Sequence, residues 1–171
     1  MREPPTQILP FLFLGTHLNG RDEPGLLSLG ITRILNVTDS ARFVEDSSIL
    51  VKHVPVSDFG DTNLMPVVKM CCDFISQAKF DGRKVLVHCR HGQNRSPAIV
   101  LAYLMAMEGV SLREAYDRVV VARPRVAIHE AYLEQLRKLE FAQTGVNTLS
   151  QDDIGPSVQE WIRRLRAEES E

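Results

Sequence analysis

The stretch that decides the fold is Val85-Leu-Val-His-Cys-Arg-His-Gly-Gln-Asn-Arg-Ser-Pro97. Residues 84–87 form a short apolar run rich in β-branched side chains, which is typical of a buried strand. From residue 96 the apolar positions take a helical spacing, with Ile99, Val100, Tyr103, Leu104 and Met107 in register. The residues between the two patterns therefore form a loop that leaves the carboxyl end of a strand and opens a helix.

A loop in this position can bind a dianion. Successive backbone N–H groups and the positive end of the helix dipole converge on one small concavity, and Gly92 lets the backbone adopt a positive φ with no Cβ in the way. The same surroundings favour the thiolate form of Cys89. Arg95 offers a planar fork of donors that matches two phosphoryl oxygens, and Ser96 can donate its hydroxyl to the cysteine sulfur. The pattern predicts a phosphate site with a nucleophile at its floor.

The string His88-Cys89-x5-Arg95-Ser96 resembles the signature loop of the cysteine-dependent protein tyrosine phosphatases. It is most similar to that of the small, atypical dual-specificity phosphatases. The similarity extends over most of the chain, through the segments 9–15, 30–37 and 131–136. It implies a phosphatase catalytic domain over residues 7–142. With only seven residues before the first strand, we expect no amino-terminal kinase-docking domain.

The resemblance also implies a mechanism. Cys89 attacks the phosphorus, Arg95 holds the phosphate oxygens, and Ser96 helps the thiolate to leave when the phosphocysteine intermediate is hydrolysed. The other loop residues expected to bind substrate are Arg90, His91, Gly92, Gln93 and Asn94. No metal and no cofactor are needed. The substrate is expected to be a protein phosphorylated on tyrosine, serine or threonine, because no long insert with a tyrosine stands between Val37 and Val51 to deepen the pocket.

The family supplies an acid for the leaving group from an aspartate upstream of the signature loop. Two candidates lie in Val56-Ser-Asp58-Phe-Gly-Asp61-Thr-Asn-Leu64. Asp58 follows an apolar strand and precedes Leu64 by the spacing that resembles the family's acid. Asp61 lies just before the next predicted helix, so its alternative role is to cap that helix. We favour Asp58 and keep Asp61 open.

Four further positions have both structural and functional interpretations. His88 is expected to be a buried residue that braces the loop, and Arg90 and His91 to lie at its rim, where they are either solvated or attract acidic substrates. Where the family shows Arg-Pro and then Pro-Asn, this chain has Arg123-Pro124 but Ile128-His129. Whether His129 supports the loop is left open.

Length and composition agree with one enzyme domain. The chain has 171 residues, 44% hydrophobic and 25% charged, with a formal net charge of −2, which gives no bulk electrostatic reason to bind nucleic acid or membrane. No apolar run approaches the roughly 18 residues of a membrane-spanning helix. The three cysteines, Cys71, Cys72 and Cys89, form no even disulfide framework, and neither they nor the five histidines show metal-ligand spacing. We expect a cytoplasmic protein, with the nucleus also open, and make no prediction of its oligomeric state.

Strand and helix patterns alternate along the chain, which predicts an α/β fold with a mostly parallel central sheet of about five strands flanked by helices. The predicted strands cover residues 8–15, 31–37, 51–56 and 84–87. The predicted helices cover 21–29, 64–78, 96–108, 112–122, which Ser111 caps, and 131–141. Residues 39–48 are predicted as a loop. Residues 143–171 are predicted as a polar linker followed by a short helix over 157–168.

Two other functions remain open. Within the same superfamily, His91 and Asn94 make the loop similar to that of the RNA 5′-phosphatases, although Ser96-Pro97 in place of their Thr-Gly argues against this. In a different class, some family members only bind phosphoproteins. Those typically lack the nucleophile, which this chain has.

Overall fold

The computed structural model describes residues 3–41 and 48–154. Its strands form one sheet in the order β1-β2-β5-β3-β4, in which the last four run parallel and β1 pairs antiparallel with β2 at one edge. They are β1 (Thr6–Leu9), β2 (Leu12–Gly15), β3 (Ile31–Asn36), β4 (Leu50–His53) and β5 (Lys84–His88). The predicted α/β fold with a mostly parallel, five-stranded sheet is confirmed.

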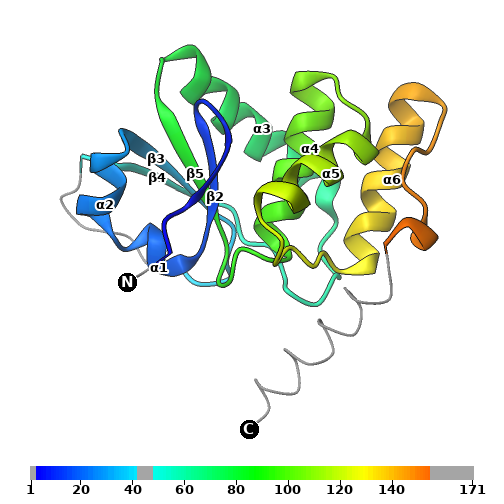
Figure 1. Ribbon diagram of the computed structural model, residues 1–171, viewed down its shortest axis with the longest axis horizontal. Coiled ribbons are helices and arrows are strands. Elements are labelled where there is room, and N and C mark those ends of the chain that lie inside the picture. Colours follow the sequence, from blue (N-terminus) through cyan, green and yellow to red (C-terminus); the bar gives the residue numbers. More distant parts are fainter. Residues whose placement is uncertain (1–2, 42–47, 155–171) are drawn as a thin grey trace, which may run out of the picture.

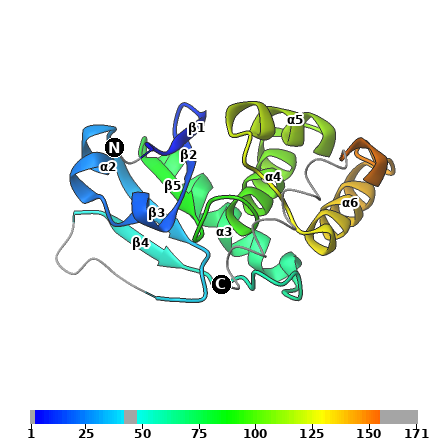
Figure 2. The same cartoon turned by 60° about the horizontal axis from the view of Figure 1, so that its bottom comes forward.

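Helices cover both faces of the sheet (Figure 1). The short helices α1 (His17–Gly20) and α2 (Glu23–Ser28) lie on one side of it. On the other side are the longer α3 (Leu64–Phe80), α4 (Arg95–Glu108), α5 (Leu112–Ala122) and α6 (Glu130–Thr144). Among these, α3 and α4 contact the central strands, and α6 packs on α4 and α5 farther from the sheet (Figure 2). A turn of 3-10 helix, η1 (Gln151–Asp153), follows.

Alternation along the strands divides the apolar side chains between two cores. Val85 and Val87 of β5 belong to the larger core, under α3 and α4, whereas Leu86 between them belongs to the smaller core that Leu26 of α2 covers. Successive side chains of a strand point to opposite faces, so a strand covered on both sides is apolar at every position. The uninterrupted apolar run of β5 therefore places it in the centre of the sheet.

Two strand predictions need correction. The strand expected over residues 8–15 is a hairpin, since Pro10 and Phe11 form a turn between β1 and β2. A proline pre-sets the backbone for a turn and donates no hydrogen bond to a ladder. The strand expected over residues 51–56 ends at His53, before Pro55, although the Val54 and Val56 amides still bond to the carbonyls of Asn36 and Val37. Helix α1 was not predicted, because four residues are too few to show a helical periodicity of apolar side chains.

The residues that follow position 142 also contribute to the packing of the domain. Leu149 and Ile154 are buried in the larger core, and buried Glu140 of α6 accepts hydrogen bonds from the Leu112 amide and from both the amide and hydroxyl of Thr148. The segment predicted as a linker is thus packed on the domain as far as Ile154. The terminal helix predicted over residues 157–168 lies outside the described residues.

The Glu140 contacts predict a stability effect. Glu140→Gln should lower the free energy of unfolding by about 1–3 kcal/mol, because an amide cannot accept the bonds that both carboxylate oxygens accept now. Denaturant unfolding measures it. Glu114→Gln, on the exposed surface of α5, is the matched control and should cost about 0.5 kcal/mol or less. Equal effects of the two changes would contradict the role given to Glu140.

Candidate active site

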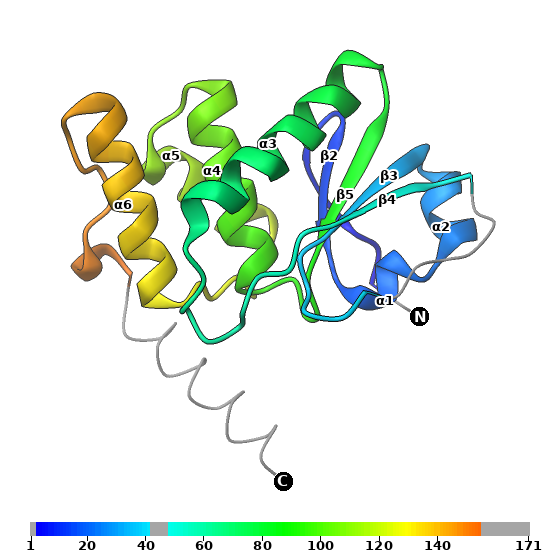
Figure 3. The same ribbon diagram turned by 180° about the vertical axis from the view of Figure 1, so that it is seen from behind.

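The loop from Cys89 to Asn94 joins the carboxyl end of β5 to the first residue of α4, as the sequence predicted. Figure 3 shows that the segments following β4 and β5 meet at the same end of the sheet. Cys89 is buried, and the Ser96 hydroxyl donates a hydrogen bond to its sulfur over 3.1 Å. The predicted pairing of these two side chains is confirmed.

The loop carbonyls are held from outside by several other elements. Because a trans peptide sets its C=O and N–H in opposite directions, carbonyls turned outward direct the N–H groups of the same peptide units inward. The Val37 amide donates to the His88 carbonyl, and the His88 ring donates to the Cys89 carbonyl. The amide and the ring of His17 both donate to the Arg90 carbonyl. The Arg123 guanidinium donates to the carbonyls of His91 and Gly92, and the Ala127 amide donates to the Gln93 carbonyl. The loop is therefore prepared for an anion before one binds.

Arg123 makes the largest single contribution to this support. Its Nε donates to the Gly92 carbonyl over 2.8 Å, its Nη2 donates to the His91 carbonyl over 3.2 Å, and the side chain is buried. Gly92 has φ +65°, and a Cβ there would lie 2.6 Å from the Gly15 carbonyl oxygen. The loop thus needs a glycine at this position both for its conformation and for its closeness to β2.

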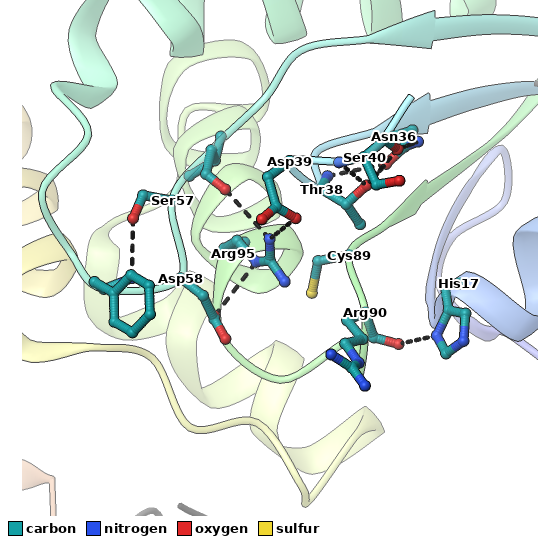
Figure 4. A network of polar contacts seen from close by, with 12 residues as sticks. His17, Asn36, Thr38, Asp39, Ser40, Ser57, Asp58, Cys89, Arg90 and Arg95 are labelled. Carbon is teal, nitrogen blue, oxygen red and sulfur yellow. Dashed lines mark hydrogen bonds and ion pairs between the residues drawn. The ribbon is translucent and has the colours of Figure 1, made fainter. Parts of the chain in front are cut away.

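Arg95 lies buried behind the sulfur with acceptors around it (Figure 4). Its Nη1 donates to the Val56 carbonyl over 3.3 Å. One Asp58 carboxylate oxygen lies 3.3 Å from Nε, outside hydrogen-bond geometry, and one Asp39 oxygen lies 3.5 Å from Nη1. Both carboxylates reach Arg95 from the solvent side, so a phosphate entering the loop competes with them for the guanidinium.

The structure separates the two candidate acids. Asp58 accepts a 2.9 Å hydrogen bond from the Asn94 side chain, which places its carboxylate at the loop. Asp61 is exposed and lines a hollow between α3 and α6. It does not cap α3 either, because the capping side chain is that of Asn63. Of these two aspartates, Asp58 is the one that lies at the loop.

Asn94 connects three parts of the site. Besides donating to Asp58, its side-chain oxygen accepts the backbone amide of His129 over 2.7 Å. His129 in turn caps α6 through its ring. His129, whose role the sequence left open, therefore supports the loop through its backbone amide. Any residue except proline could donate this hydrogen bond. Gln93, which was also predicted to bind substrate, is partly exposed in the loop.

His88 is buried, as expected of a residue that braces the loop. Burial is the main cause that lowers the pKa of its ring from about 6.5 to about 4, so the imidazole is neutral at pH 7. Its Nδ1 bonds the Cys89 carbonyl, and a Cβ on Gly20 would lie 2.7 Å from its Nε2. Arg90 and His91 are exposed at the rim of the loop, as predicted.

Sequence reasoning missed three residues near the loop. Asp39 follows β3 and contacts Arg95. Asn36 and Thr38 are buried beside it, with the Asn36 side-chain oxygen accepting both the amide and the hydroxyl of Thr38. The available signal was their position at or just after the carboxyl end of a buried parallel strand, because ligands bind where the carboxyl ends of such strands meet.

Over residues 3–41 and 48–154, no group of three or more histidine, cysteine or acidic side chains is placed to hold a metal ion. Cys71 and Cys72 are buried in the core, where burial raises their pKa values to about 12 and about 11. The same described residues include no helix that is both long and apolar enough to span a bilayer.

Comparison with known proteins identifies a family. Residues 12–142 match the model "Dual specificity phosphatase, catalytic domain". The chain is 38% identical over 136 residues to Dual specificity protein phosphatase 1 of Arabidopsis thaliana, covering 80% of this chain and 69% of that protein. It is 37% identical over 136 residues to human Dual specificity protein phosphatase 2, covering 80% of this chain but only 43% of the longer relative.

A solved structure agrees with this match. The crystal structure of human DUSP28 superposes with a TM-score of 0.78 at 30% sequence identity. The alignment covers 84% of this chain and 97% of that one. The family model, over residues 12–142, includes the whole loop from Cys89 to Asn94.

The neutral state of His88 predicts a dependence of stability on pH. Because its pKa is lower in the folded protein than in the unfolded chain, the unfolded state binds more protons between pH 6.5 and 4, and stability falls as the pH falls through that window. We expect a loss of about 2 kcal/mol between pH 7.5 and pH 5 from this residue. Denaturant unfolding at the two pH values should show that His88→Gln removes this component, whereas His91→Gln, at the exposed rim, leaves it.

Proposed function

The chain belongs to the dual specificity phosphatase family, as one of its small, atypical members, and we propose that it hydrolyses phosphotyrosine and phosphoserine or phosphothreonine in proteins. The observation that supports this best is the assembly around one sulfur. Cys89 has the Ser96 hydroxyl 3.1 Å away, and Arg95 and Asp58 lie at the same loop. The groups that we propose as nucleophile, phosphate-binding group and acid thus lie at one loop.

In the first half-reaction the Cys89 thiolate attacks phosphorus in line with the departing oxygen. Arg95 and the inward N–H groups of the loop hold the three equatorial oxygens as charge redistributes. Asp58 gives its proton to the leaving oxygen as the P–O bond breaks. The products of this step are the dephosphorylated substrate and a phosphocysteine.

In the second half-reaction water attacks the phosphocysteine. Asp58, now a carboxylate, takes a proton from that water. The S–P bond breaks and leaves the electron pair on sulfur, which the Ser96 hydroxyl stabilises by its hydrogen bond. Phosphate departs with Cys89 restored, so no external oxidant, reductant or cofactor enters the cycle.

The two alternative functions are less well supported. A pure binding module has no need for a cysteine with a hydroxyl donor and a neighbouring aspartate, and the presence of Cys89, Ser96 and Asp58 at one loop therefore argues against it. The resemblance to RNA 5′-phosphatases depends partly on Asn94, and this side chain already has a structural use, since it joins Asp58 to the start of α6. Its presence therefore does not require an RNA substrate.

We also propose that the protein works in a reducing compartment such as the cytoplasm. Two observations support this: the described cysteines are free, and the proposed mechanism needs the Cys89 thiolate unoxidised. Localisation of the tagged protein in cells tests this proposal, and a secreted protein would contradict it.

The nucleophile is tested by Cys89→Ser. This variant should lose turnover of an aryl phosphate to below about 1% of the wild type, because a serine hydroxyl without an activating base is a poor nucleophile. It should keep the phosphate-binding loop, so vanadate or phosphate should still bind in calorimetry. Cys72→Ser, in the core, is the control and should retain turnover. Substantial residual activity in Cys89→Ser would contradict the assignment of Cys89 as the nucleophile.

The acid is tested by Asp58→Asn and Asp61→Asn. Loss of a general acid typically slows a reaction by roughly 10²–10⁴-fold, and the loss should be larger for poor leaving groups, such as alkyl phosphates, than for activated aryl esters. Asp61→Asn should change kcat little for either class. A leaving-group dependence in Asp61→Asn that is absent from Asp58→Asn would transfer the role to Asp61.

A further inference from the structure

A cavity opens beside the loop, next to Arg90. It encloses about 300 Å³ and is bounded by three parts of the chain: α1 with the residue after it, the segment that follows β3, and the start of the signature loop. Its lining residues are His17, Gly20, Arg21, Asn36, Thr38, Asp39, Ser40, His88 and Arg90. Figure 4 shows several of these residues beside Cys89. The proposed mechanism uses none of them apart from the Arg90 backbone.

One wall of this cavity is fixed by hydrogen bonds among its own residues. The Asn36 side-chain oxygen accepts the Thr38 amide over 2.9 Å and the Thr38 hydroxyl over 2.7 Å. Its side-chain nitrogen donates to the Ser40 carbonyl over 3.2 Å, and the Thr38 hydroxyl also lies 2.9 Å from that carbonyl. Because these polar groups are already hydrogen-bonded to one another, they define the shape of the cavity and contribute little to binding a ligand.

The remaining polar groups are mainly cationic. Arg21 and Arg90 are exposed at the cavity, and neither forms an ion pair with another residue in the part of the chain that the structure describes. The His17 Nδ1 donates to the Arg90 carbonyl over 2.8 Å. Asp39 is the acidic side chain of the lining, and its carboxylate contacts Arg95. Among the described residues that line the cavity, the guanidinium groups of Arg21 and Arg90 therefore supply most of the charge.

From this arrangement we infer that the cavity is a subsite for a second oxyanion on the same phosphopeptide substrate, supplied either by an acidic side chain or by a second phosphate near the scissile one. Guanidinium groups bind carboxylates and phosphates through paired donors. Arg90 belongs to both sites, so the second oxyanion must lie within a few residues of the first. The inference rests on the proposed protein phosphatase activity and adds to it a preference among substrates.

The test compares phosphotyrosine peptides that differ at one neighbouring residue, in two sets of three. In one set the residue before the phosphotyrosine is alanine, glutamate or phosphoserine, and in the other set the residue after it is varied in the same way. We expect kcat/KM to be roughly fivefold higher for the best anionic peptide than for the alanine peptide, the effect of about 1 kcal/mol from a solvent-exposed ion pair. The advantage should decrease with added salt. The glutamate and phosphoserine peptides distinguish the two sources of the oxyanion.

Arg21→Gln should abolish this preference and leave kcat/KM for the alanine peptide unchanged, because the Arg21 side chain is outside the signature loop. Arg83→Gln is the matched control. It removes the same charge from an exposed arginine just before the amino end of β5, whereas the cavity lies at the carboxyl end of that strand. The preference should survive in that variant. The same comparison of peptide affinities in the Cys89→Ser background, by calorimetry, measures the subsite without turnover.

Several results would overturn the inference. Equal kcat/KM for all peptides in the wild type would remove the subsite but leave the phosphatase assignment intact. An equal loss of the preference for anionic peptides in Arg21→Gln and Arg83→Gln would show that it depends only on net charge. An Arg21-dependent preference for phosphoinositide vesicles over every peptide would assign the cavity to a lipid headgroup. Absence of turnover on all substrates would contradict the proposed function, and the affinities in the Cys89→Ser background would then decide on the subsite alone.

Discussion

The structure depends on one constraint: the signature loop must turn several N–H groups into one small volume, and its carbonyls therefore face outward and need other partners. A buried carbonyl without a partner costs roughly 1–3 kcal/mol. Val37 after β3, His17 of α1, Arg123 at the end of α5 and Ala127 before α6 supply them. Much of the architecture around the loop can thus be understood as the means of holding it in this conformation.

The same constraint explains how charge is distributed at the site. The chain has a formal net charge of −2, but the buried groups behind the loop include the guanidinium groups of Arg95 and Arg123, whereas the neighbouring His88 is neutral. Asp39 and Asp58 approach Arg95 from the exposed side. Positive charge is therefore fixed within the protein and negative charge lies at the mouth, where solvent weakens its competition with a phosphate.

Sequence reasoning succeeded where the structure is determined by neighbouring residues. The strand, loop and helix around Cys89 follow from local periodicity, and the Ser111 cap of α5 follows from its side chain, which accepts the Glu114 amide. It failed where contacts join distant segments. Arg123 meets Gly92 across 31 positions, and Asn94 meets Asp58 across 36. A sequence pattern identifies the polar residue in such a pair but not its partner, because the fold alone brings the two together.

The three described cysteines show that burial alone does not determine the chemistry of a thiol. Cys71, Cys72 and Cys89 are exposed by 0%, 6% and 3%. In the core, burial raises the pKa values of the first two and keeps them as thiols. Cys89 instead faces the Ser96 hydroxyl and lies at the amino end of α4, where a thiolate has donors to accept from. The arrangement of donors around the sulfur, which the outward carbonyls and the start of α4 maintain, is what distinguishes a nucleophile from a core residue.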